Sequence, residues 1–179
     1  PVFVNGDYEV TYTVTAVNAS TVSLTNITLN ENLNNTFPLP TTYTLVGTPS
    51  VTSMGSSLTI NPLFNGSTDI SLTTPSTSTL LPLWKDTILF KVKVTPNKVF
   101  CPFKNTVIGF ATQFGSVVVA DSSNNGFIWD PDGDGDPTNN DTMTVVCFEE
   151  YTLEIPTGFS PNADGVNDLF VIKGLNGRK

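Results

Sequence analysis

Two segments of the chain alternate apolar and polar side chains from one residue to the next. In 8–17, the large apolar side chains fall on even positions and the polar ones mostly on odd positions. Apolar side chains also occupy every even position of 88–94, on either side of Lys91 and Lys93. A period of two residues is the pattern of a β-strand that buries one face. The chain is therefore predicted to form sheets with one buried and one exposed face.

The composition extends this prediction to the whole chain. Threonine occurs 27 times and alanine five times, with 13 glycines and 13 prolines, so strand and turn formers dominate. Shorter strand candidates lie at 22–25, 27–29, 43–48, 57–60, 69–73, 105–113, 116–120 and 142–148. Roughly seven to nine short strands, with no alternation of strands and helices, predict an all-β fold, an antiparallel immunoglobulin-like β-sandwich.

Length and charge limit the domains and partners. The 179 residues suffice for one domain plus a fragment of another. The net charge is −8, but 1–120 is balanced, 121–168 carries eleven acids without a base, and 169–179 carries three bases. We expect no nucleic-acid partner, because phosphate binding needs clustered Lys and Arg. A chain that starts at Pro1, with no signal peptide, is expected to be a processed piece of a longer protein.

The sequence contains no histidine and two cysteines. These counts exclude Ser-His-Asp and Cys-His catalysis, zinc sites that use His, and a four-thiolate zinc site. Carboxylate pairs of the glycosidase type would be the remaining catalytic option. Because the acids cluster in one loop at the spacing of metal ligands, we expect no enzyme.

Cys101 and Cys147 lie beside or within strand candidates. In a secreted chain, they are predicted to form a disulfide that closes a long loop, which contributes about 4 kcal/mol in the chain-entropy model. The alternative is two buried free thiols in a reducing compartment.

The segment 130–141 has the spacing D-x-D-x-D-G-x5-[D/E] of a calcium-binding loop. Acids at positions 1, 3 and 5 converge on the ion, Gly135 at position 6 permits the sharp turn, and positions 7 and 12 supply a backbone carbonyl and a closing carboxylate. The predicted Ca²⁺ ligands are Asp130, Asp132, Asp134, Asp136 and Asp141. Pro131 and Pro137 argue against flanking EF-hand helices, so the loop is expected between strands. The alternative is a flexible acidic loop whose aspartates only form turns.

A second acidic loop, 160–168, again places oxygen ligands two residues apart with a glycine after the third. No acid stands at its position 12, which is Val171. The candidate Ca²⁺ ligands are Asn162, Asp164, Asn167 and Asp168. Spacing alone leaves two interpretations open, a calcium site and a plain turn rich in Asn and Asp.

As a sequence motif, the same segment is more specific than its ligand spacing alone. It reads IPTGFSPNADGVNDLF over 155–170, followed by IKGL over 172–175. This closely resembles the opening of the gliding motility-associated C-terminal domain family, F-[ST]-P-N-x-D-G-x-N-D-x-[FW], which is the type B sorting domain of the type IX secretion system in Bacteroidota. The motif positions are Phe159, Pro161, Asn162, Asp164, Gly165, Asn167, Asp168 and Phe170. The resemblance covers only 153–179, whereas the family's domain continues for several more strands.

The resemblance implies a domain order and a destination. Residues 1–148, which resemble the immunoglobulin-like (DUF11-type) repeats of bacterial surface proteins, would form the sandwich, 149–158 a linker, and 159–179 the incomplete start of the sorting domain, with a strand at 169–172. The family's role implies export by the type IX translocon. It also implies an outer-membrane partner of the PorP/SprF type and an extracellular location at the cell surface, associated with the outer membrane.

We therefore expect a non-catalytic, calcium-stabilised segment of a cell-surface adhesin, with a gliding motility adhesin as a candidate parent. The alternative is an accessory domain of a type IX-secreted hydrolase. The parent protein would contact a surface glycan or an abiotic surface. Trp84 and Trp129, with Phe114 and Phe127, are the residues that could stack on a sugar. We favour the other interpretation, in which Trp84 packs in the core and Trp129 covers the Asp-rich loop.

Overall fold

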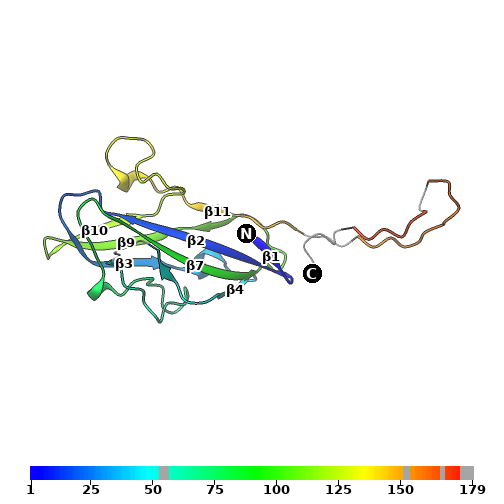
Figure 1. The fold of residues 1–179 in the computed structure, drawn as a ribbon, viewed down its shortest axis with the longest axis horizontal. Coiled ribbons are helices and arrows are strands. Elements are labelled where there is room, and N and C mark those ends of the chain that lie inside the picture. Colours follow the sequence, from blue (N-terminus) through cyan, green and yellow to red (C-terminus); the bar gives the residue numbers. More distant parts are fainter. Residues whose placement is uncertain (53–56, 151–153, 166–167, 174–179) are drawn as a thin grey trace.

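The computed structural model describes residues 1–52, 57–150, 154–165 and 168–173. These residues form antiparallel sheets, which confirms the predicted all-β class (Figure 1). The helices of the described residues are three or four residues long, too short to span a bilayer. The strands are β1 Val2–Val4, β2 Asp7–Val17, β3 Leu24–Glu31, β4 Thr42–Leu45, β5 Ser50–Val51, β6 Thr79–Leu80, β7 Lys85–Thr95, β8 Phe103–Asn105, β9 Val107–Gln113, β10 Val117–Ser122 and β11 Thr144–Val146; the helical turns are α1 Leu33–Thr36, η1 Pro75–Thr77 and η2 Pro137–Asn139.

The strands assemble into two principal sheets and a small ladder. One sheet has the order β1-β2-β7-β4, with β5 also paired to β7, and the other has the order β10-β9-β3-β6. The strands β1, β2, β7 and β4 correspond to strands A, B, E and D of an immunoglobulin-like sandwich, and β3, β9 and β10 correspond to strands C, F and G, with β6 as an additional edge strand. The third, two-stranded sheet pairs β8 with β11.

The pairing of β2 with β7 is the longest ladder and carries the predicted alternation. It runs from Tyr8 opposite Val94 to Val17 opposite Lys85. The even-numbered side chains at the core of this pair are buried, because successive side chains of a strand point to opposite faces. The second sheet completes the core through buried side chains that include Ile27 and Leu29.

Three of the weaker strand predictions were wrong. Segments 57–60 and 69–73 contribute only isolated bridges, of Ile60 with Thr73 and of Ser71 with Asn30. Between them, the side-chain oxygen of Asn65 accepts hydrogen bonds from the backbone of three following residues, which holds a turn instead of a ladder. The predicted strand 169–172 is also not formed. Its neighbour Lys173 makes a single bridge with Glu154, so no ladder supports it.

A buried polar cluster lies inside the sandwich where β3, α1 and β8 meet. Glu31 is fully buried, and both of its carboxylate oxygens accept hydrogen bonds from the Asn105 amide, at 2.8 and 2.9 Å. The same amide donates to the Thr36 hydroxyl at 3.1 Å. Burial raises the pKa of Glu31 to about 7, although the hydrogen bond from Asn105 opposes the shift. This carboxyl group therefore favours its neutral form in the folded state.

This raised pKa predicts that stability depends on pH through Glu31. The neutral carboxyl stabilises the fold fully below about pH 4.5, its ordinary pKa, and this contribution is lost as the pH rises through about 7. Relative to the wild type, Glu31→Gln should gain about 3 kcal/mol of unfolding free energy between pH 4.5 and pH 8. Urea denaturation in EGTA measures this gain, with Glu9→Gln as the control at a partly exposed ion pair. Parallel pH profiles for wild type and Glu31→Gln would contradict the assignment.

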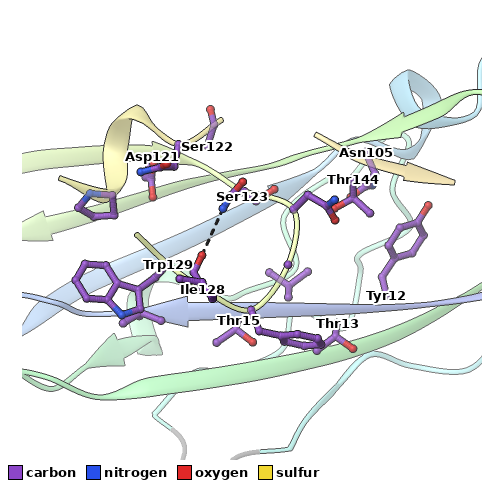
Figure 2. A pocket seen from close by; sticks show the side chains of 18 of the residues that line it. Tyr12, Thr13, Thr15, Asn105, Asp121, Ser122, Ser123, Ile128, Trp129 and Thr144 are labelled. Atoms are coloured by element: carbon purple, nitrogen blue, oxygen red, sulfur yellow. Dashed lines mark hydrogen bonds between the residues drawn. The ribbon is translucent and has the colours of Figure 1, made fainter. Parts of the chain in front are cut away.

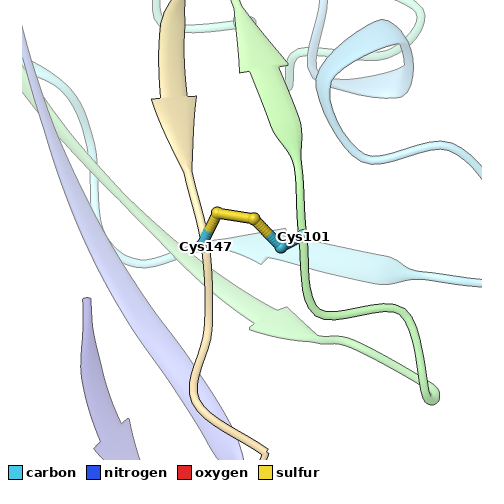
Figure 3. The surroundings of a disulfide bond; sticks show 2 residues. All are labelled: Cys101 and Cys147. Carbon is cyan, nitrogen blue, oxygen red and sulfur yellow. A yellow bond between two sulfur atoms is a disulfide. The ribbon is translucent and has the colours of Figure 1, made fainter.

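Cys101 and Cys147 form the predicted disulfide (Figure 3). Their Cα atoms lie 4.5 Å apart across a sequence separation of 46 residues. The bond joins the segment before β8 to the segment after β11, next to the ladder of these two strands. It therefore fastens the long connection that follows β10 back onto the sandwich.

Removal of the disulfide should destabilise the domain without changing its fold. Because the bond restricts the unfolded chain, Cys101→Ala with Cys147→Ala should lower the free energy of unfolding by roughly 2–5 kcal/mol. Guanidinium denaturation of the double variant, compared with the oxidised wild type, measures this loss. Equal stability of oxidised wild type and double variant would contradict it.

Candidate metal centre

The Asp-rich segment forms part of the long connection between β10 and β11. Figure 1 shows this connection as a yellow loop that projects from the sandwich. The loop contains η2 but no flanking helices of the EF-hand kind among the described residues, in agreement with the prediction from Pro131 and Pro137. The candidate ligands thus lie on a surface loop anchored by a strand at each end.

Three of the predicted ligands converge. One carboxylate oxygen from each of Asp130, Asp132 and Asp134 lies within 4.8 Å of the other two. Oxygens that bind one Ca²⁺ at about 2.4 Å can be at most about 4.8 Å apart, so this spacing fits a shared calcium ion. Three converging carboxylates at the surface would otherwise repel one another.

Two glycines give the loop its curvature. Gly133 and Gly135 have φ angles of +74° and +89°, a region that other residues rarely adopt. Their N–H groups donate to the two carboxylate oxygens of Asp130, at 2.8 and 2.9 Å. A Cβ atom added at either glycine would meet no atom within 4 Å, so the backbone conformation is what requires glycine here. Asp130 thus organises the turn that brings the other two aspartates to it.

The remaining contacts of the cluster leave room for a cation. Asp134 accepts from the backbone of Asp136 and from the Asn139 amide, both at 2.8 Å. Asp132 accepts a long bond of 3.4 Å from the Asn140 amide. A carboxylate has about four acceptor positions, so each of these acids keeps lone pairs for a metal ion. The residues present therefore fit Ca²⁺.

Asp136 and Asp141 lie outside the converging group. The Asp136 carboxylate caps η2, because its Oδ1 accepts from the Thr138 N–H at 3.0 Å and from the Thr138 hydroxyl at 2.7 Å. These hydrogen bonds lower the pKa of Asp136. Its side chain is thus engaged elsewhere, as expected for a position whose ligand would be the backbone carbonyl. The closing role of Asp141 remains a prediction.

Sequence reasoning missed one acid near this loop, Asp121 at the end of β10. Burial raises the pKa of Asp121, and the charges of Asp141 and Asp136 add to the shift. The signal in the sequence was its place at the start of the acidic segment 121–168, but spacing alone did not link Asp121 to the Asp-rich loop.

The second acidic loop is organised around Asp168. Its carboxylate accepts from the N–H groups of Asn162 at 3.1 Å, Ala163 at 2.8 Å and Gly165 at 2.7 Å. Asp164 accepts from the Asn162 amide at 2.9 Å. Asn167 lies outside the described residues. These contacts favour the interpretation as a turn, because Asp168 already satisfies three backbone donors.

Other residues of the segment 154–173 join the two ends of this loop. The rings of Phe159 and Phe170 meet edge to face at 5.9 Å. Glu154 and Lys173 pair through their backbones and through a salt bridge of 3.4 Å. The motif spacing thus corresponds to a closed loop, with Asp168 at its centre and the two phenylalanines beside it.

Neither tryptophan is buried. The prediction that Trp84 packs in the core is wrong, since the residue is 44% exposed at the turn before β7. Trp129 is 47% exposed and immediately precedes the first aspartate of the converging group. The fluorescence of its indole can therefore report on cation binding in the loop.

Comparisons of the chain with protein-family models, with curated proteins and with solved structures found no match. The metal-site hypothesis therefore rests on the loop itself, on three converging carboxylates and two glycines with positive φ.

Calcium should raise the thermal stability of the domain. With a dissociation constant of about 10⁻⁴ M, 1 mM Ca²⁺ should add about 1.4 kcal/mol and raise the melting temperature by about 3–6 °C relative to EGTA. Asp132→Asn should reduce this difference, whereas Glu150→Gln removes the same charge outside the loop and should not. Equal melting temperatures in 1 mM Ca²⁺ and in EGTA would be the contrary result.

Proposed function

We propose that this chain is a non-catalytic, calcium-stabilised segment of a cell-surface adhesin, whose C-terminal part directs type IX secretion and attachment to an outer-membrane partner. The observation that carries the proposal is the convergence of Asp130, Asp132 and Asp134 on a loop of an antiparallel sandwich. A structural Ca²⁺ of modest affinity suits an extracellular module, since millimolar Ca²⁺ outside the cell suffices to fill it.

The disulfide supports the same location. Disulfides persist in oxidising environments and are rare in cytosolic proteins. The bond of Cys101 with Cys147 and the proposed calcium site act on the same part of the chain, because both restrain the segment that joins β10 to β11. Together they would stiffen one side of a sandwich exposed to mechanical load.

A passive role agrees with the placement of the acidic groups. Glu31, whose pKa is raised to about 7, would suit acid–base chemistry, but it is fully buried and bonded to Asn105. The Asp-rich acids converge at a spacing that suits one cation. We therefore assign binding and mechanical roles, with no reaction.

We propose that the C-terminal segment is the sorting signal. Its motif resembles the type B sorting domain, and its described part presents apolar side chains to solvent, including Phe159 and Leu169. Exposed apolar groups on a small loop are suited to contact with another protein. The partners we propose are the type IX translocon and an outer-membrane protein of the PorP/SprF type.

The sorting role is tested in the full-length parent protein expressed in a bacterium with type IX secretion. Asp168→Ala removes the acceptor of three backbone donors, so it should open the loop and leave the protein inside the outer membrane. Asp132→Asn, in the calcium loop, is the control and should still reach the surface. Surface labelling and fractionation measure both. Normal surface display of Asp168→Ala and of a deletion of 154–179 would refute the sorting role.

A further inference from the structure

One side of β2 has no partner strand over most of its length. β7 pairs with β2 from Tyr8 to Val17, but β1 pairs only with Asp7, Tyr8 and Glu9 on the opposite side. Among the described residues, no strand continues this pairing along 10–17. The first sheet of the sandwich therefore ends in an open edge.

The unpaired backbone groups of this edge can be assigned. The N–H of Asn18 donates to the Trp84 carbonyl at 2.9 Å, so even-numbered residues of β2 exchange hydrogen bonds with β7. The alternation of an antiparallel ladder then directs the N–H and C=O groups of Thr11, Thr13 and Thr15 outward. No hydrogen bond among the described residues uses these backbone groups. They form a regular row of donors and acceptors, which another extended chain can match.

A groove runs beside this row. Its cavity of about 380 Å³ is lined by Thr11, Thr13, Thr15 and Val17 and, on the facing side, by the segment 121–129. Figure 2 shows Thr13 and Thr15 with Ser123, Ile128 and Trp129 across the cavity. The groove thus has a strand edge as one wall and a loop segment as the other.

A second cavity, of about 330 Å³, opens on the same side between the two sheets. Its lining includes apolar side chains of both sheets, such as Val14, Ala16 and Ala111. A strand placed along β2 would therefore find apolar surface for side chains that point inward. Strand addition gains affinity from main-chain hydrogen bonds and specificity from such pockets.

The rim of the groove is acidic. Asp121 lines both cavities, and the charges of Asp136 and Asp141 act on it. No lysine or arginine lines either cavity in the part of the chain that the structure describes. Natural edge strands are commonly protected by lysine, and this one is not. The groove is thus suited to an extended segment that is apolar and followed by positive charge.

The chain itself contains such a segment. Leu169–Ile172 is rich in strand-forming residues, yet its side chains are exposed and it lies in no ladder. Lys173 follows it directly, in an exposed salt bridge with Glu154, and the three bases of 169–179 are the only ones after Lys104. Figure 1 shows that this tail leaves the sandwich at the end opposite to β10. A second copy is therefore better placed than the same chain to supply it.

We propose that the tail segment Leu169–Ile172 of one copy adds as an antiparallel or parallel strand to the open edge of β2 in a second copy. The apolar side chains would enter the groove, and the positive charge after the segment would meet its acidic rim. Because donor and acceptor surfaces differ, the contact is heterologous and would link copies head to tail into an open chain. This goes beyond the proposed function, since neither calcium binding nor sorting requires it.

Paired variants test this contact by analytical ultracentrifugation of the chain 1–179 over a range of concentrations. The wild type should self-associate as its concentration rises. Thr13→Pro removes an outward N–H, and Val171→Pro removes a donor from the tail, so each should weaken association by about tenfold or more. Thr13→Ala and Val171→Ala keep the backbone N–H groups and should associate nearly as the wild type does.

A mixture of the two proline variants gives the sharpest result. Thr13→Pro keeps an intact tail and Val171→Pro keeps an intact groove, so the mixture should form a dimer that stops there. Circular dichroism and thermal melting establish that each variant is folded. If Thr13→Pro fails to fold, the comparison of Val171→Pro with Val171→Ala still tests the proposal. A wild type that stays monomeric up to about 1 mM, or proline variants that associate as the wild type does, would overturn the proposal.

Discussion

The pairing of β2 with β7 is the constraint on which the rest of the structure depends. Both strands have eleven residues, and their register places Tyr8 opposite Val94 and Val17 opposite Lys85. A shift of one residue would turn every core side chain of a strand to the solvent face. Once this ladder is fixed, β4 and β5 have an edge on β7, and the second sheet has an apolar surface to cover.

The buried interior of the sandwich also limits where charged side chains can lie. Glu31 lies in this interior, where its carboxylate oxygens accept hydrogen bonds from Asn105 and burial raises its pKa. Most acids are instead placed in the connection between β10 and β11 and beyond it. There, the turn around Gly133 and Gly135 gathers three carboxylates at the spacing of calcium ligands. The acidic excess therefore lies mainly in loops, one of which gathers carboxylates at the spacing of calcium ligands, while residues 1–120 remain balanced in charge.

Sequence alone predicted the features that depend on local pattern. The alternation in 8–17 and 88–94 predicted the central ladder, the cysteines predicted the disulfide, and the Asp spacing predicted the converging acids. Sequence alone did not predict the features that depend on contacts between residues far apart in the chain. The cluster of Glu31 with Asn105 and Thr36 joins three elements, so no spacing reveals it. Leu169–Ile172 has strand-forming residues but no ladder, because pairing is not a local property.

Terbium luminescence tests the central claim, that the Asp-rich loop holds a cation, most directly. Trp129 immediately precedes Asp130 and is well placed to sensitise a Tb³⁺ ion bound by Asp130, Asp132 and Asp134. Excitation of tryptophan should produce Tb³⁺ emission that saturates at one ion for this loop, is displaced by Ca²⁺, and is lost in Asp132→Asn. Emission that is absent, or that survives both excess Ca²⁺ and Asp132→Asn, would contradict the account.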